Sequence, residues 1–151
     1  MIPEHFDRFQ SLLKIGRRKE AAASVRQFIE SFSDLKEKSQ WTKAYLDGND
    51  PNKKIWHELY VCVVFPSLLE GYRQGDPWSI RWLARTTSHL YQAQALWQQF
   101  KMKTEAQFLR ELLVIAPQDT EAQEELLATH ISWFDYAAHE WPAGILYGMD
   151  G

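Results

Sequence analysis

Apolar side chains recur at helical spacing along almost the whole chain, and this pattern constrains the fold more than any other feature. The longest stripe would share one face of a helix for about five turns, and it consists of Ile80, Leu83, Ala84, Thr87, Leu90, Tyr91, Gln94 and Trp97. No pair of segments shows the alternation of apolar and polar residues that two half-buried strands require. The sequence therefore predicts an all-α protein.

Capping residues and helix breakers divide the first third of the chain into three helices. Pro3 suits the first turn of a helix, and Gly16 is expected to end that helix. A second helix follows from about Arg18. Ser33 or Asp34 can cap a third helix, around Leu35–Leu46, and Asp34 has capping-type spacing to Glu37.

The run Asp47-Gly48-Asn49-Asp50-Pro51 is the clearest loop signal in the sequence. We expect Asp50 to cap a long helix that begins at Pro51. The β-branched run 61–64 also fits a strand, but its flanks are helical and no partner strand is present. Pro66 is expected to kink or break this helix.

Three further helices complete the prediction. Asp76 and Pro77 start the helix that carries the long stripe, and Thr104 caps a shorter helix that Pro117 stops. Asp119 or Thr120 caps the last helix, which Pro142 and Gly144 are expected to end. The result is a single domain, 1–151, of about seven helices packed as antiparallel hairpins, as a bundle or as a short repeat-like array.

Charge is distributed unevenly along the chain, although the net charge is only −3. Residues 104–151 hold nine carboxylates and one cation, Arg110, so this third carries a charge of −8. The helix dipole accounts for part of the crowding of Asp119, Glu121, Glu124 and Glu125 near one helix start. The rest favours a positively charged macromolecular partner, which would relieve the repulsion and associate rapidly.

No residue pattern indicates catalysis or metal binding. The five histidines include no pair at the spacing of a helical zinc site, and no nucleophile motif or phosphate-binding loop occurs. We therefore expect no enzyme activity, no cofactor and no metal. The single cysteine, Cys62, and the lack of a long apolar run predict a cytoplasmic protein without a membrane span.

A basic cluster, Lys14, Arg17, Arg18 and Lys19, spans the first helix junction. The cluster is consistent with binding to phosphate, with a solvated turn, or with ion pairs to the acidic third of the chain. The negative net charge argues against nucleic-acid binding.

Two short segments resemble tetratricopeptide repeats. Gly16 and Ala21, followed by Val25, Phe28 and Ile29, resemble the second helix of such a repeat. Leu112-Leu113, followed by Pro117, Asp119 and Ala122, resembles the junction between two repeats. This resemblance implies a scaffold or adaptor that binds proteins, and such an adaptor is expected to present a concave groove lined by aromatic residues.

The whole chain also resembles the small immunity proteins of bacterial contact-dependent or polymorphic toxin systems. The resemblance is carried by 75–83, Gly-Asp-Pro-Trp-Ser-Ile-Arg-Trp-Leu, and by the aromatic run from Trp133 to Pro142. It implies a bacterial cytoplasmic protein that neutralises one toxin, commonly a nuclease. Asp119, Glu121, Glu124 and Glu125 would then contact a basic toxin surface, with Trp141 or Tyr147 as anchors. Whether the apolar C-terminal tail docks on its own domain or on a partner stays open, as does the oligomeric state.

Overall fold

The computed structural model describes the backbone of residues 1–50 and 53–148, and the side chains of these as far as residue 138. The described backbone consists of helices and connecting segments and contains no strand, so the all-α prediction is confirmed.

The chain order of the helices is simple. The first half contains α1 (Pro3–Lys14), α2 (Arg18–Glu30), α3 (Leu35–Asp47), α4 (His57–Leu59), the π-helical segment η1 (Tyr60–Val64) and α5 (Phe65–Arg73). The second half contains α6 (Pro77–Arg85), α7 (Thr87–Gln92), α8 (Gln94–Gln98), α9 (Glu105–Ile115) and α10 (Thr120–Gly148).

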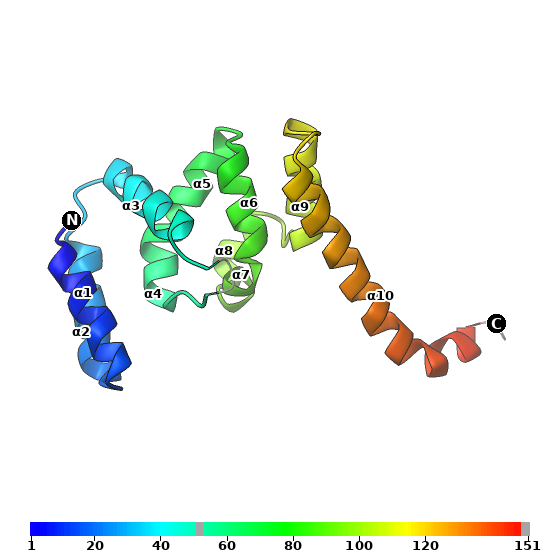
Figure 1. The fold of residues 1–151 in the computed structure, drawn as a ribbon, viewed down its shortest axis with the longest axis horizontal. Coiled ribbons are helices and arrows are strands. Elements are labelled where there is room, and N and C mark those ends of the chain that lie inside the picture. The colour runs from blue at the N-terminus through cyan, green and yellow to red at the C-terminus, as the bar shows by residue number, and fades with distance from the viewer. Residues whose placement is uncertain (51–52, 149–151) are drawn as a thin grey trace.

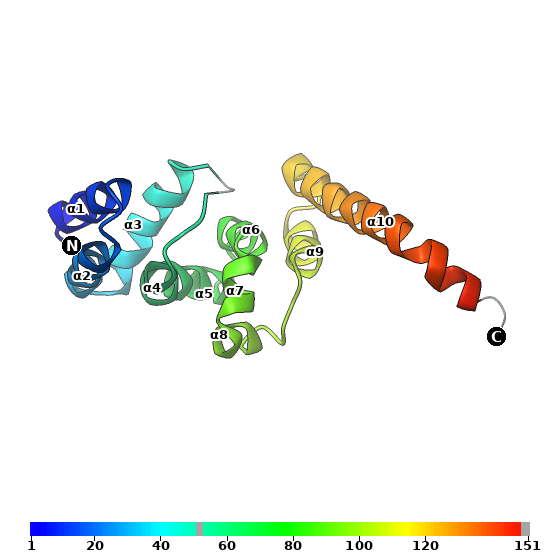
Figure 2. The ribbon, with the colours of Figure 1, turned by 90° about the horizontal axis from the view of Figure 1, so that it is seen from below.

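These helices pack side by side into an elongated array (Figures 1 and 2). The hairpin of α1 and α2 forms one end, and contacts then run from α3 to α5, from α5 to α6, from α6 to α9 and from α9 to α10. α10 is much longer than the helix on which it packs, and its second half projects away from the array. The array therefore has a broad packed end and a projecting helical end.

Aromatic residues fill the core at the end that contains α1, α2 and α3. Phe28 is fully buried. Its ring lies 5.1 Å from that of Phe6, 5.0 Å from that of Phe32 and 5.2 Å from that of Trp41, measured between centroids. The contacts with Phe32 and Trp41 are edge-to-face, and aromatic contacts of this kind add to the stabilisation from burial. They hold the first hairpin against α3.

The predicted helix starts depend on local side-chain caps, and four of them are confirmed. Asp34 accepts the Glu37 N–H at 2.8 Å, and Asp76 accepts the Trp78 N–H at 3.4 Å. Thr104 forms a reciprocal capping box with the residue three positions on. Asp119 accepts the N–H of residue 122 at the start of α10.

The predicted helix start at Pro51 is wrong. Residues 53–56 are not helical, and α4 begins only at His57. Tertiary contacts explain the difference: Ile55 is buried at 8% exposure, and its N–H points to Nε2 of His89 at 3.5 Å. Ile55 is therefore buried, and its N–H has a hydrogen-bond acceptor, although this segment is not helical.

Pro66 does not end the helix that follows, because helical backbone runs without a gap from His57 to Arg73. A π-helical turn precedes the proline. In an α-helix the carbonyl of Cys62 would accept from residue 66, but proline has no N–H. Lys38 donates to this carbonyl at 3.0 Å instead, which satisfies the orphaned acceptor.

Two other helix boundaries differ from the prediction. The stripe of 80–97 is divided among α6, α7 and α8, because Thr86 (φ −110°) and Ala93 (φ −117°, ψ 72°) leave the helical conformation. The last helix continues through Pro142 and Gly144 to Gly148. A proline within a helix removes one hydrogen bond, and a long helix can tolerate this loss where its carbonyls meet solvent.

The approach of α5 to α6 provides a direct test of the packing. A Cβ at Gly71 would lie 1.8 Å from Oγ and 2.6 Å from Cβ of Ser79. We expect Gly71→Ala to lower the free energy of unfolding by about 1–3 kcal/mol through overpacking, measured by urea denaturation. Adding Ser79→Gly should recover part of this loss, and additive effects of the two substitutions would contradict the contact.

Candidate functional site

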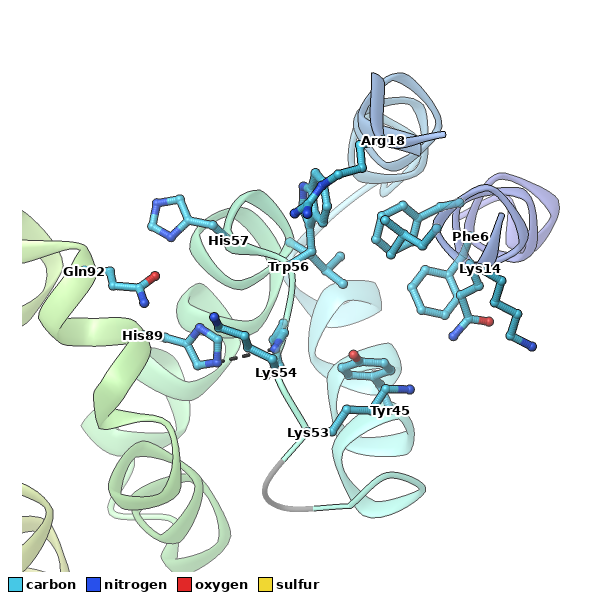
Figure 3. A pocket seen from close by; sticks show the side chains of 15 residues that line it. Phe6, Lys14, Arg18, Tyr45, Lys53, Lys54, Trp56, His57, His89 and Gln92 are labelled. Atoms are coloured by element: carbon cyan, nitrogen blue, oxygen red, sulfur yellow. Dashed lines mark hydrogen bonds between the residues drawn. The ribbon is translucent and has the colours of Figure 1, made fainter. Parts of the chain in front are cut away.

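A groove of about 680 Å³ lies at the packed end, between α1, the start of α2, α3, residues 53–57 and α7 (Figure 3). Its apolar lining comes from Phe6, Phe9, Leu13, Tyr45, Ile55, Trp56 and Leu59. Its polar lining comes from Gln10, Lys14, Arg18, Lys53, Lys54, His57, His89 and Gln92. The groove thus combines aromatic walls with nitrogen-bearing side chains.

The non-helical residues 53–56 create this groove. They connect α3 to α4 and place Trp56 beside the first hairpin, next to Arg18 at the start of α2 (Figure 3). The Trp56 ring meets the edge of Phe9 at 5.4 Å, and the guanidinium of Arg18 lies 5.8 Å from the indole centroid. A helix in this segment would carry Trp56 elsewhere, so the local backbone determines the site.

Positive charge surrounds the groove. Lys14, Arg18, Lys53 and Lys54 line it, and none of its described lining residues is Asp or Glu. These four cations form no ion pair with any residue that the structure describes. By contrast, Arg26, Arg81, Arg85 and Lys103 each pair with a carboxylate.

His89 connects the groove to the core. Its ring stacks on Tyr60 at 4.8 Å, and its Nε2 faces the N–H of Ile55. Burial, followed by electrostatic repulsion from the side chains of His57 and Lys54, lowers the pKa of His89 below its usual value. The imidazole is therefore held in the neutral form, which leaves Nε2 able to accept a hydrogen bond.

Three of the four acids proposed as partner contacts lie together on α10 and its cap, where they meet arginines of the same chain. Asp119 pairs with Arg81, while Glu121 and Glu125 pair with Arg85. Arg85 is only 15% exposed, and its guanidinium lies 5.0 Å from the ring centroid of Trp82. These pairs attach α10 to α6, so they give the acids a role in the fold.

Glu124, the fourth acid, is exposed and forms no ion pair among the described residues. Negative charge is nevertheless concentrated nearby. Burial, followed by the charge of Glu125, raises the pKa of the Glu105 carboxyl. The two arginines therefore neutralise only part of the acidic potential.

The projecting half of α10 exposes large apolar side chains. Trp133, Phe134 and Tyr136 are 54%, 62% and 66% exposed. The side chains of Trp141 and Tyr147, the proposed anchors, lie outside the described residues.

The basic cluster identified in the sequence is divided by the fold. Lys14 and Arg18 line the groove, whereas Arg17 pairs with Glu20. Sequence reasoning missed Lys53, Lys54 and His89 as site residues. The string Lys53-Lys54-Ile55-Trp56-His57 directly after a loop was a usable signal, because it places cations beside an aromatic residue.

Among the described residues, no three His, Cys, Asp or Glu side chains are grouped closely enough to hold a metal ion. The described helices include none with the length and apolar character needed to cross a membrane. No family model, curated protein or solved structure matches the chain.

Arg85→Met tests the attachment of α10. This change leaves two carboxylates without their shared cation, so we expect the free energy of unfolding to fall by about 1–3 kcal/mol. Amide hydrogen exchange at the start of α10 should accelerate. Arg110→Met, at an exposed position of α9, is the matched control and should change stability by less than about 0.5 kcal/mol. Equal losses in the two variants would contradict the proposed attachment.

The lowered pKa of His89 predicts a loss of stability in weak acid. As the pH falls, the unfolded chain binds the proton first, near pH 6.5, while the folded imidazole stays neutral until lower pH. Stability is therefore full above about pH 6.5 and declines as the pH falls toward the folded pKa. Chemical denaturation between about pH 7.5 and about pH 5.5 should show a shallower decline for His89→Gln. An unchanged slope for His89→Gln would refute the assignment.

Proposed function

We propose that this chain is a protein-binding module that receives a segment of a partner protein in the groove between its first hairpin and α7. The observation that carries the proposal is the aromatic-lined concavity itself. Its volume of about 680 Å³ falls within the range of about 300–1,000 Å³ that is typical of ligand-binding pockets. Such a groove holds a few side chains of a partner.

The composition of the groove walls supports the same proposal. Aromatic residues are enriched at the centres of protein interfaces, where they provide large and rigid apolar contact areas. Phe6, Phe9 and Trp56 line the groove on the side of the first hairpin, and Tyr45 lines it on the side of α3. Stacked helical pairs are also a common way to present a concave binding surface.

The toxin-inhibitor hypothesis stays a prediction. Its acidic contacts would have to compete with Arg81 and Arg85, which already pair with Asp119, Glu121 and Glu125. Exposed Glu124 and the aromatic residues of the projecting α10 support it. We place the groove first because aromatic residues line it and its four cations form no ion pair with the residues that the structure describes.

Selection from a random peptide library displayed on phage tests the proposal. We expect selected peptides to bind the unmodified protein and to lose at least about tenfold in affinity, about 1.4 kcal/mol, when Gln92→Trp or Gln10→Trp fills the groove. Both glutamines line the groove, so adding an indole there obstructs the site without removing a packed side chain.

Gln98→Trp is the matched control, because Gln98 is exposed on α8 and does not line the groove. This variant should bind the selected peptides as the unmodified protein does. Selection of peptides that bind all three tryptophan variants equally would rule out the groove as the binding surface.

A further inference from the structure

The groove cations come from three segments of the chain. Lys14 lies at the end of α1, Arg18 at the start of α2, and Lys53 with Lys54 on the connection before α4 (Figure 3). No described acid of the lining offsets them. Several like charges around one concavity repel one another, and low-dielectric walls focus their potential into the cavity.

The positive potential of the groove also acts on His89. Besides burial, electrostatic repulsion from His57 and Lys54 disfavours a proton on His89, which lines the same cavity. A bound anionic group would reduce the repulsion among the lysines and gain charge-assisted hydrogen bonds. Charge complementarity therefore favours a partner segment that carries negative charge.

We propose that the segment held in the groove is acidic, with Asp or Glu side chains next to an aromatic or aliphatic anchor. This inference rests on the proposed function, because it names the partner chemistry of the same groove. The anchor would enter between Phe9, Trp56 and Tyr45, and its neighbouring carboxylates would meet Lys14, Lys53 and Lys54.

The ring contacts favour an acidic peptide over a nucleic acid. Single-stranded nucleic acids bind through bases that stack on open aromatic faces. One face of Tyr45 is already stacked on Trp41, with centroids 4.7 Å apart, and Arg18 covers a face of Trp56.

The test compares two charge variants with the same change in net charge. The groove variant combines Lys14→Gln, Lys53→Gln and Lys54→Gln, three exposed positions whose loss leaves the Arg18–Trp56 contact in place. The control combines Arg8→Gln, Lys101→Gln and Arg110→Gln, which are exposed and outside the groove. Thermal melting should be the same for both.

The random peptide library is selected on each protein, and the enriched peptides are then measured singly by fluorescence anisotropy. On the unmodified protein and on the control, we expect enrichment of Asp and Glu beside Phe, Trp, Tyr or Leu. Replacing the acids of an enriched peptide by Gln or Asn should weaken binding by about tenfold or more. The unsubstituted peptide should bind the groove variant about tenfold or more weakly than it binds the unmodified protein. Raising the ionic strength from about 0.1 M to about 1 M should also weaken binding, because the Debye length falls from about 10 Å to about 3 Å.

The outcomes separate the two proposals. Peptides that need the open groove but show no acid preference would overturn the acidic inference and leave the protein-binding module standing. The absence of any peptide sensitive to Gln92→Trp would overturn both. An oligodeoxythymidylate that binds more tightly than the peptides, and loses affinity in the groove variant, would show that the cations serve a phosphate chain and would also overturn the inference.

Discussion

The position of Ile55 and Trp56 between the first hairpin and α7 is the constraint on which the proposed site depends. Ile55 buries its side chain in the core and directs its N–H to His89, so the chain before α4 cannot remain helical. Trp56 consequently lies against Phe9 and beneath Arg18, and Lys53 and Lys54 are left exposed beside it. One short extended segment therefore joins the core to the groove and sets the groove's charge.

The two ends of the array differ in whether their cations are paired with carboxylates. At the α10 end, Arg81 and Arg85 pair with carboxylates from the start of α10, and these pairs help to attach that helix. At the hairpin end, the groove cations have no such partners among the described residues. A charge count along the sequence identifies the acidic third as the unusual region. In the folded protein the four groove cations are the better candidates for partner contacts, because they are not already paired with carboxylates of the described chain.

The sequence was sufficient for the helix starts that depend on side-chain caps a few residues away along the chain. Asp34, Asp76, Thr104 and Asp119 cap helices through contacts within three residues, and all four were predicted. It was insufficient where distant residues decide. A helix was expected to start at Pro51, and its absence over residues 53–56 depends on His89, which is 34 positions from Ile55. The continuity of the helix through Pro66 depends on Lys38 of α3, which donates to the carbonyl of Cys62. The groove was missed for the same reason, since its lining comes from segments that are separated in sequence. Its composition was visible in the string from Lys53 to His57, but the concavity required the fold.

Hydrogen–deuterium exchange of the full chain, with and without a saturating bound peptide, tests the central claim most directly. The account predicts that binding slows exchange in residues 53–57, at the facing positions of α1 and in α7, and leaves the projecting half of α10 unchanged. Protection confined to α10, with the first hairpin and α7 exchanging as in the free protein, would contradict it and would favour the acidic, aromatic helix as the partner-binding surface.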